Sequence, residues 1–280
     1  MVTRADKNFK IIMCLLLTIW SLFVLIPIAL MFINTFKTGH ELAFNSWGWP
    51  QNFVFDNYQR LMYFNGGVIM RAYFNAIFVS TTYTILTLGV ASLAAFAFSK
   101  YRFRGATIIF ALLLGTMMIP PEVTLPPLFI LFARIGWLNT YQVQIFPGIA
   151  NVFCMFLFKQ YMDGMPNSLV ESARIDGAGH FKVYSRIMLP ICMPAVGALT
   201  ILTFLAKFNE FVFPQLMITN QRYMPIMVIL PMLNDHDNLW NIPWELLMTG
   251  CAIVVIPLIA VFFAFQKYFM SSVTLGAVKE

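Results

Sequence analysis

Long apolar stretches separated by short polar segments run along the whole chain. A helix needs about 20 apolar residues to cross a hydrocarbon layer about 30 Å thick. Six stretches meet this requirement: residues 11–33, 72–99, 106–132, 135–158, 190–218 and 246–266. The pattern therefore predicts an all-α integral membrane protein, in which six transmembrane helices form a single domain over residues 1–280.

The composition agrees with a membrane location. Of the 280 residues, 60% are hydrophobic and only 11% are charged, whereas ordinary soluble domains are roughly a quarter charged. So few charged residues cannot cover the surface of a water-soluble enzyme of this size. The first apolar stretch is longer than a signal-peptide core and no small-x-small cleavage site directly follows it, so we expect a retained helix.

Lysine and arginine are unevenly divided between the two sides of the predicted membrane domain. Twelve fall on the side that holds both termini, and five fall on the other side. Cytoplasmic loops carry the excess of these residues, so we expect both termini in the cytoplasm. The net charge of +6 therefore reflects membrane topology and does not indicate nucleic-acid binding. The twelve are Arg4, Lys7, Lys10, Lys100, Arg102, Arg104, Lys159, Arg174, Lys182, Arg186, Lys267 and Lys279, and the five are Lys37, Arg60, Arg71, Arg134 and Arg222.

Two long segments, about 34–71 and 219–245, lie on the expected outer side. They contain aromatic residues, Pro or Gly and few charges, so we expect partial packing against the membrane face rather than disorder. The tryptophans expected on this side suit an interfacial aromatic belt. They are Trp47, Trp49, Trp137, Trp240 and Trp244.

The most informative polar segment is the expected inner loop over residues 163–190. Ser168 and Glu171 have the spacing of a capping box, and they follow Pro166 and Asn167. The spacing predicts a short helix from about Ser168 to Asp176, which Gly177 ends by adopting a positive φ. Such an element is either a docking surface or a plain surface loop with well-made caps.

The same loop resembles a signature of inner-membrane permease subunits of binding-protein-dependent ABC importers. The segment Glu171-Ser172-Ala173, then Gly177 after three residues, then Ile187 to Pro190 after nine more, is similar to the EAA---G---------I-LP pattern. Ser172 in place of the second small residue is the one departure, and it is mild. Within this family the chain looks most like the maltose-permease (MalG-like) carbohydrate branch, and the resemblance covers nearly the whole chain. The segments that support this assignment are Ser99–Gly105, Phe208–Phe211 and Gln266–Lys279.

The resemblance implies a role for residues 163–190, here named the coupling loop. In this family the loop between spans 4 and 5 carries a cytoplasmic coupling helix that sits in a cleft of a separate ATPase subunit. The implied ATPase-coupling residues are Glu171, Ser172, Ala173, Asp176, Gly177, Ile187, Leu189 and Pro190. The implied partners are an ATPase dimer that carries ATP and Mg, a second and different permease subunit, and an extracytoplasmic solute-binding protein. The implied location is the bacterial or archaeal plasma (inner) membrane, with several crossings.

The chain has no sequence motif for chemistry of its own. It contains no GxxxxGK[ST] and no Gly-Lys pair, so an ATPase on another polypeptide is required. The four cysteines and three histidines are dispersed, with neither a zinc spacing nor a disulfide framework. We therefore predict no catalytic residue, no metal and no cofactor on this chain.

Three charged residues fall inside the apolar stretches, where charge is costly and usually faces a cavity or a partner helix. Lys207 and Glu210 are three residues apart on the fifth span and could pair with each other. They form either a structural ion pair or part of the translocation pathway. Asn209 could bind sugar hydroxyls, and we favour the pathway for Asn209 and Glu210 and the structural role for Lys207.

Glu122 is the third of these charges, and it lies among four prolines. Prolines break the helical hydrogen-bond ladder, so a broken helix that lines a cavity is one way to tolerate them. Glu122 then lines the pathway or its outer gate, or else packs at a helix end. Asn75 and Asn151 suit interhelical hydrogen bonds, and Asn151 is also a candidate for the pathway.

These observations predict a permease subunit that forms half of the pathway of an ATP-driven importer. The resemblance implies a sugar or an oligosaccharide as the substrate, with a polyol or glycerol phosphate as the alternative. A stand-alone secondary transporter is a second hypothesis, although no inverted repeat is visible. A membrane enzyme subunit is a third, although it would require histidines or carboxylates clustered within the membrane.

Overall fold

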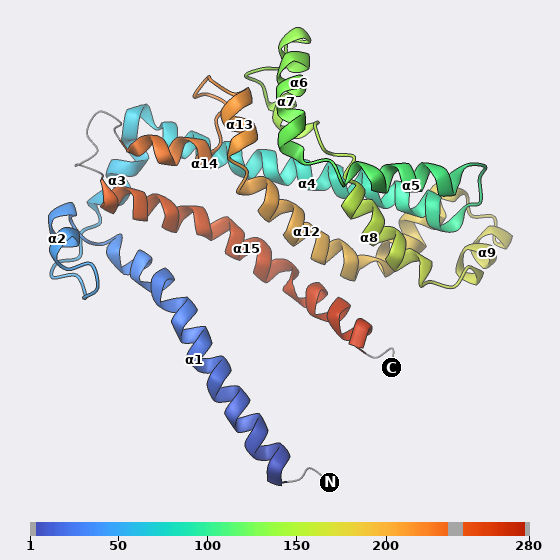
Figure 1. The fold of residues 1–280 in the computed structure, drawn as a ribbon, viewed down its shortest axis with the longest axis horizontal. Coiled ribbons are helices and arrows are strands. Elements are labelled where there is room, and N and C mark those ends of the chain that lie inside the picture. Colours follow the sequence, from blue (N-terminus) through green and yellow to red (C-terminus); the bar gives the residue numbers. More distant parts are fainter. Residues whose placement is uncertain (1–3, 235–242, 278–280) are drawn as a thin grey trace. The chain divides into compact units, whose positions relative to one another are not determined.

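The structure is a computed structural model that describes residues 4–234 and 243–277, and every regular element in these ranges is helical (Figure 1). The predicted all-α class is therefore confirmed. Trp240 of the expected aromatic belt and Lys279 of the twelve basic residues on the expected cytoplasmic side lie outside the described residues. The elements are α1 (Arg4–Asn34), α2 (Gly39–Phe44), α3 (Asp56–Tyr63), η1 (Phe64–Gly66), α4 (Val68–Lys100), α5 (Ala106–Thr116), α6 (Pro121–Arg134), α7 (Tyr141–Ile145), α8 (Val152–Asp163), α9 (Ser168–Ile175), α10 (His180–Val183), the π-helical η2 (Tyr184–Met188), α11 (Leu189–Ile191), α12 (Met193–Phe208), α13 (Val212–Met217), α14 (Ile226–Ile229), η3 (Leu230–Leu233) and α15 (Trp244–Ala277).

Three helices in the described ranges are long and apolar enough to cross a membrane. They contain residues 9–34 of α1, all of α4 and residues 244–268 of α15. Two bent helix pairs raise the count to five if each pair is one crossing. The expected first, second and sixth spans lie within α1, α4 and α15, while the total of six spans and the cytoplasmic termini stay predictions.

The other three expected spans are not continuous helices. The third span bends by 94° between α5 and α6, just before the paired prolines Pro120 and Pro121. The fourth is interrupted between α7 and α8, where Gly148 has a φ of +85° that a right-handed helix does not allow. The prediction of one helix over residues 135–158 was therefore wrong.

The chain divides into two compact units, Met1–Met70 with Leu230–Ile256, and Arg71–Ile229 with Pro257–Glu280. In the first unit, the segment between α1 and α3 is ordered by a buried lysine. The Lys37 side chain is fully buried, and its Nζ donates to the carbonyls of Asn45 at 2.6 Å and Gly48 at 2.7 Å. Burial lowers the pKa of Lys37, and the nearby Glu41 carboxylate opposes that shift. Lys37 therefore serves as an internal brace rather than as a surface charge.

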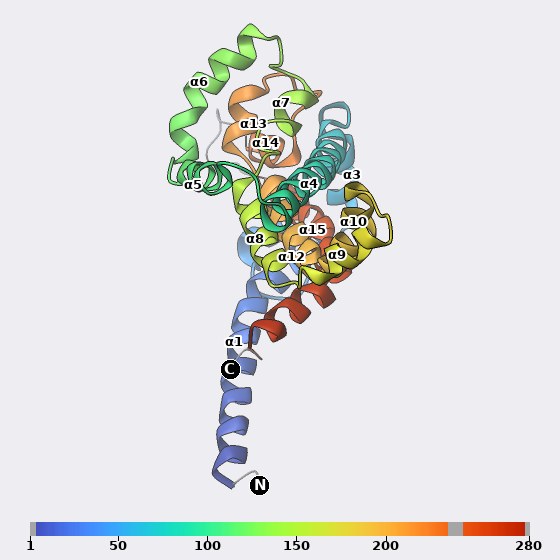
Figure 2. The same cartoon turned by 90° about the vertical axis from the view of Figure 1, so that its right-hand side faces the viewer.

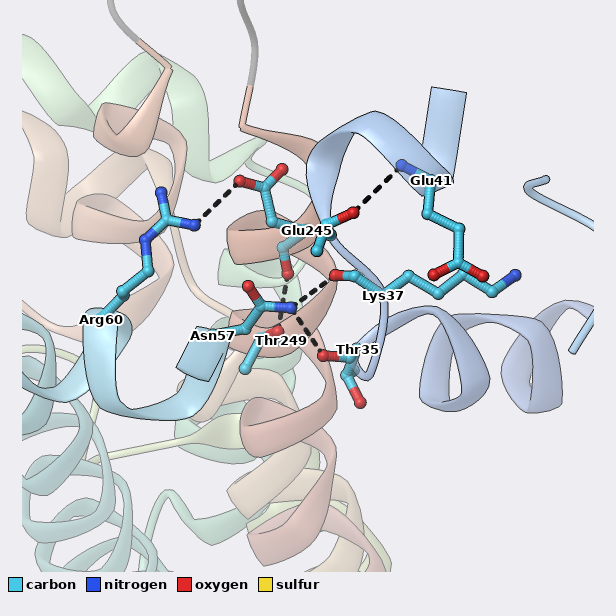
Figure 3. A network of polar contacts seen from close by, with 8 residues as sticks. Thr35, Lys37, Glu41, Asn57, Arg60, Glu245 and Thr249 are labelled. Atoms are coloured by element: carbon cyan, nitrogen blue, oxygen red, sulfur yellow. Dashed lines mark hydrogen bonds and ion pairs between the residues drawn. The ribbon is translucent and has the colours of Figure 1, made fainter. Parts of the chain in front are cut away.

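A second set of polar contacts closes the same unit (Figure 3). The Asn57 Nδ2 on α3 donates to the carbonyls of Thr35 at 2.8 Å and Lys37 at 2.7 Å. Arg60 pairs with Glu245 at 3.3 Å and thereby joins α3 to the first turn of α15. Residues 34–70 are thus built into a folded unit, while the packing of segment 34–71 against the outer membrane face stays a prediction.

A hydrophobic core lies in the part of the second unit that includes the coupling loop. The core contains residues of α4, α8, α9, η2 and α12, among them the fully buried Phe158 and Met188. Because α4, α8 and α12 carry small or flexible side chains there, including Ala91, Ala95 and Met155, their backbones can pack closely. The core extends from the middle of α4 to the coupling loop, whose α9 and α10 are visible in Figure 2.

The brace at Lys37 generates a prediction. Lys37→Met keeps most of the side-chain volume but leaves two carbonyls without their donor, at a cost of about 1–3 kcal/mol. Limited proteolysis of the outer segment should therefore accelerate by about tenfold or more. Arg71→Met, which removes an exposed basic side chain, is the control. Equal protease resistance of Lys37→Met and the parent would show that the brace contributes nothing.

Candidate functional site

The charged residues of the fifth apolar stretch lie where its helix ends. Lys207 is in the last turn of α12, Asn209 is the C-cap, and Glu210 follows before α13 begins at Val212. The expectation of a continuous helix with these charges in its middle was wrong. A reason is Pro214, whose ring would clash with the carbonyl of Glu210 if the helix continued.

Lys207 and Glu210 form the ion pair that their spacing predicted. Lys207 Nζ lies 2.6 Å from Glu210 Oε2, and the two side chains are 7% and 34% exposed. The ammonium also lies 4.8 Å from the ring centroid of Tyr83 and 5.5 Å from that of Phe213. The lysine is thus held by a carboxylate and two aromatic rings, while the carboxylate keeps an accessible side.

Tyr83 links this ion pair to a distant break in the fold. Its hydroxyl, on α4, donates to the carbonyl of Gly148 at 3.0 Å. A Cβ on Gly148 would lie 3.0 Å from the Tyr83 hydroxyl oxygen, so a glycine allows this close approach. The role of Tyr83 could not be predicted, because a single tyrosine in a charge-free apolar stretch gives no signal of its partners.

Two cavities meet at Tyr83, Lys207 and Glu210. The first has a volume of about 420 Å³ and the second about 400 Å³. Cavities of this size accept small organic ligands. The first is also lined by Asn151, Phe153, Cys154, Leu199, Leu202, Thr203 and Ala206. The second is also lined by Pro121, Glu122, Thr124, Leu125, Leu128, Pro147, Gly148, Phe211, Val212 and Phe213.

Three of the four predicted pathway residues line these cavities. Glu210 lines both, Asn151 lines the first, and Glu122 in the first turn of α6 lines the second. Asn151 is also the N-cap of α8, since its Oδ1 accepts from the Cys154 amide at 2.9 Å. Asn209 is exposed and lines neither cavity, so the structure does not bring it together with the other three.

Asn75 joins segments that are far apart in sequence. Its Nδ2 donates to the carbonyls of Arg222 at 2.9 Å and Met224 at 3.1 Å, and its Oδ1 accepts from the Tyr141 hydroxyl at 2.8 Å. Asn75 is buried. These bonds between α4, α7 and the segment before α14 support the expected role in tertiary hydrogen bonding.

The coupling loop contains the short helix that its sequence predicts. Helix α9 spans Ser168–Ile175, and Gly177 follows with a φ of +78°. The capping box was wrong: Asn167 is the N-cap and makes no side-chain capping bond, and Ser168 lies inside the helix. The Asn167 side chain is used elsewhere, because its Oδ1 accepts from Lys100 Nζ at 3.2 Å.

The motif residues of the coupling loop divide into an inward and an outward set. Ala173 is buried, and Ile187 and Leu189 pack against the core of the second unit. The outward set is exposed and consists of Glu171, Ser172, Asp176, Gly177 and Pro190. The motif therefore combines anchors to the core with a surface that is free to meet another molecule.

Two large apolar side chains stand out from that surface. Ile175 is 87% exposed and Phe181 is 72% exposed. Glu171 lies in the first turn of α9, and its carboxylate makes no hydrogen bond or ion pair with the parts of the chain that the structure describes. Exposed apolar groups beside an unpaired carboxylate are typical of an interaction surface.

The described residues contain no cluster of three or more His, Cys, Asp or Glu that could hold a metal ion. Residues 87–274 match the family described as binding-protein-dependent transport system inner membrane component. The chain belongs to this family. It is therefore a membrane-embedded permease subunit of a transport system rather than an enzyme.

Individual relatives agree with this family. The chain is 34% identical to the arabinooligosaccharides transport system permease protein AraQ of Bacillus subtilis, over 97% of this chain and 96% of the relative. It is 35% identical to the trehalose/maltose transport system permease protein MalG of Thermococcus litoralis, over 73% and 74% of the two chains. Its fold matches a chain of a bacterial ABC transporter involved in the import of the acidic polysaccharide alginate, with a TM-score of 0.82, 23% identity and coverage of 96% and 99%.

The ion pair generates a prediction for transport. Glu210→Gln should reduce the amount of assembled complex, because an unpaired charge at membrane depth costs at least ~2.5 kcal/mol. Lys207→Met with Glu210→Gln should restore the amount of complex by removing both charges, while uptake stays low because both residues line the cavities. Asn209→Ala, which changes neither cavity wall, is the control and should keep its uptake. Normal uptake by the double variant would assign the pair a structural role alone.

Proposed function

We propose that this subunit forms half of the translocation pathway of an ATP-driven importer for a sugar or an oligosaccharide. The observation that carries the proposal is the pair of cavities that meet at Tyr83, Lys207 and Glu210. Their walls combine apolar surface, an aromatic ring and hydrogen-bonding groups. The paired charges leave this part of the wall nearly neutral, which suits an uncharged solute with many hydroxyls.

The named relatives support the choice of substrate. One belongs to an arabinooligosaccharides transport system and another to a trehalose/maltose transport system. Both are 34% or more identical to this chain, so we carry a saccharide substrate over to it. Neither name supports the alternative of a polyol or glycerol phosphate.

We further propose that the coupling loop docks in a cleft of a separate ATPase, with ATP and Mg bound on that partner. Glu171, Ser172, Asp176 and Gly177 face the ATPase, together with the exposed Ile175. Ala173, Ile187 and Leu189 hold the loop on the membrane domain, while Pro190 is exposed at the end of the loop. Closure of the ATPase dimer on ATP then moves the loop and switches the pathway between outward-facing and inward-facing states.

The proposed assembly contains this chain, a second and different permease, an ATPase dimer and an extracytoplasmic solute-binding protein. Within it, residues 1–280 act as one transmembrane domain with six crossings and both termini in the cytoplasm. In this arrangement the bent pair α5 with α6 counts as one crossing, and α12 counts as another, because α10 and η2 belong to the coupling loop. The interrupted pair α7 and α8 supplies the remaining one.

Co-purification tests the proposed assembly. A tagged chain extracted in mild detergent should recover two copies of an ATPase and one copy of a different permease. The control is the same chain with Ile175→Asp, which changes an 87% exposed side chain of α9 and leaves the buried residues of the loop in place, and which should retain the permease and recover less ATPase. A stable homodimer that transports without an ATPase would contradict the proposal.

The backbone at Gly177 gives a sharper test of coupling. A Cβ there has no atom within 4 Å, so only the φ of +78° restricts the substitution. Gly177→Val should therefore abolish uptake while the membrane domain still folds, because a β-branched residue is strained at positive φ. Gly177→Asn is the matched control and should keep most uptake, because Asn tolerates this conformation.

A change of charge at Glu171 tests the coupling role of the loop independently of Gly177. Glu171→Lys should uncouple ATP hydrolysis from uptake, because it reverses a charge that is exposed to the partner and lies at a helix N-terminus. Glu171→Gln should have a smaller effect. Normal uptake in both Gly177→Val and Glu171→Lys would remove the coupling role from this loop.

A further inference from the structure

Lys100 fixes the entry to the coupling helix. It is the last residue of α4, and its Nζ donates to the carbonyl of Met165 at 2.8 Å and to Asn167 Oδ1 at 3.2 Å. Both acceptors lie directly before α9. An ammonium bound to two oxygens of one short segment restrains that segment strongly, because charged hydrogen bonds exceed neutral ones in strength.

Tyr101 fixes the exit from the same helix. The hydroxyl of Tyr101 lies 2.7 Å from His180 Nδ1, and Nη2 of Arg174 lies 3.0 Å from the same nitrogen. The Arg174 guanidinium also lies 5.1 Å from the ring centroid of Tyr101. Arg174 is in the last turn of α9, and His180 begins α10. Tyr101 therefore contacts both sides of the Gly177 turn.

Helix α4, which ends at Lys100 directly before Tyr101, contacts a further part of the loop. Ser92 Oγ on α4 lies 2.7 Å from the hydroxyl of Tyr184 in η2. The ring of Phe96 packs on Tyr101 and Tyr184, with centroids 5.3 and 5.6 Å away. The segment before α9, the Gly177 turn after it and η2 are thus all in contact with the C-terminal part of α4 or with Tyr101, the residue that follows it.

The same helix continues without a break to the cavities. Helix α4 contains no proline, and Tyr83 lies 17 residues before Lys100 on it, which corresponds to about 25 Å. Helix α12 also connects the coupling loop to the cavities, but it is not in line with the loop. A bend of 77° separates it from the helices α10 to α11 that end the loop. Helices α8 and α12 share a hydrophobic core with the loop. In the part of the chain that the structure describes, the polar contacts on both sides of α9 come from Lys100 and Tyr101, at the end of α4.

We propose that Lys100 and Tyr101 form a clasp that passes movement of the coupling loop along α4 to Tyr83 and the cavities. Both are positioning residues: they contact neither ATP nor the solute. When the ATPase displaces α9, the clasp forces α4 to move with it, and Tyr83 then shifts against Gly148 and Lys207. This inference rests on the proposed coupling role of the loop.

The test uses the complete complex in proteoliposomes, with the binding protein and a radiolabelled saccharide, and measures uptake and ATP hydrolysis together. Lys100→Met and Tyr101→Phe should each leave the complex assembled and hydrolysing ATP. Uptake per ATP hydrolysed should fall about tenfold, the equivalent of about 1.4 kcal/mol of coupling. Lys100→Arg keeps a donor for both oxygens and should restore most of the ratio. Arg102→Met, an exposed basic residue beside the clasp, is the control and should change nothing.

The outcomes separate the clasp from the proposed function. Loss of uptake per ATP in the clasp variants and in Gly177→Val supports both. Loss in Gly177→Val with a normal ratio in both clasp variants overturns the clasp and leaves the coupling loop intact. Normal ratios in all variants, Glu171→Lys included, reject the coupling role and the clasp with it. If Lys100→Met prevents assembly, Tyr101→Phe decides the question, because it removes one hydroxyl and keeps the ring.

Discussion

The ion pair between Lys207 and Glu210 is the constraint on which the candidate pathway depends. A lysine that is 7% exposed within an apolar protein is stable only with its charge compensated, and here a carboxylate at 2.6 Å and two aromatic rings provide that compensation. The pair spans the point where α12 ends, because Lys207 is in its last turn and Glu210 follows the C-cap. Both residues line the two cavities, so the charge compensation takes place in the cavity wall.

Breaks in helices recur in the second unit, and two of them have a local cause. The paired prolines Pro120 and Pro121 directly follow the 94° bend, at the start of α6, and Gly148 with its positive φ separates α7 from α8. Backbone groups freed at membrane depth need partners or a water-filled cavity. The carbonyl of Gly148 finds such a partner in the hydroxyl of Tyr83. In contrast, α4 is continuous, which suits a helix that transmits movement.

The sequence predicted much of this molecule because some of its signals are local. Hydrophobic run length located α1, α4 and α15, and the positive φ of Gly177 followed from a glycine after a short helix. Three features could not be predicted, because they depend on contacts between distant residues. Lys37, which the sequence places among the loop charges, is fully buried. Tyr83 contacts a carbonyl 65 residues away in the sequence. Asn167, and not Ser168, is the N-cap residue of α9. The end of α12 just after Lys207 was missed for a different reason, because apolar run length does not register the helix stop that Pro214 favours.

Site-specific photo-cross-linking from Ile175 tests the central claim most directly. This side chain is 87% exposed on α9 and contributes little to the core, so a photoreactive residue there leaves the fold intact. In membranes that contain the assembled complex, the account predicts a covalent adduct with the ATPase subunit whose yield changes when ATP is trapped on that subunit. An adduct with lipid or with the second permease alone, from a complex shown to contain the ATPase, would contradict the account.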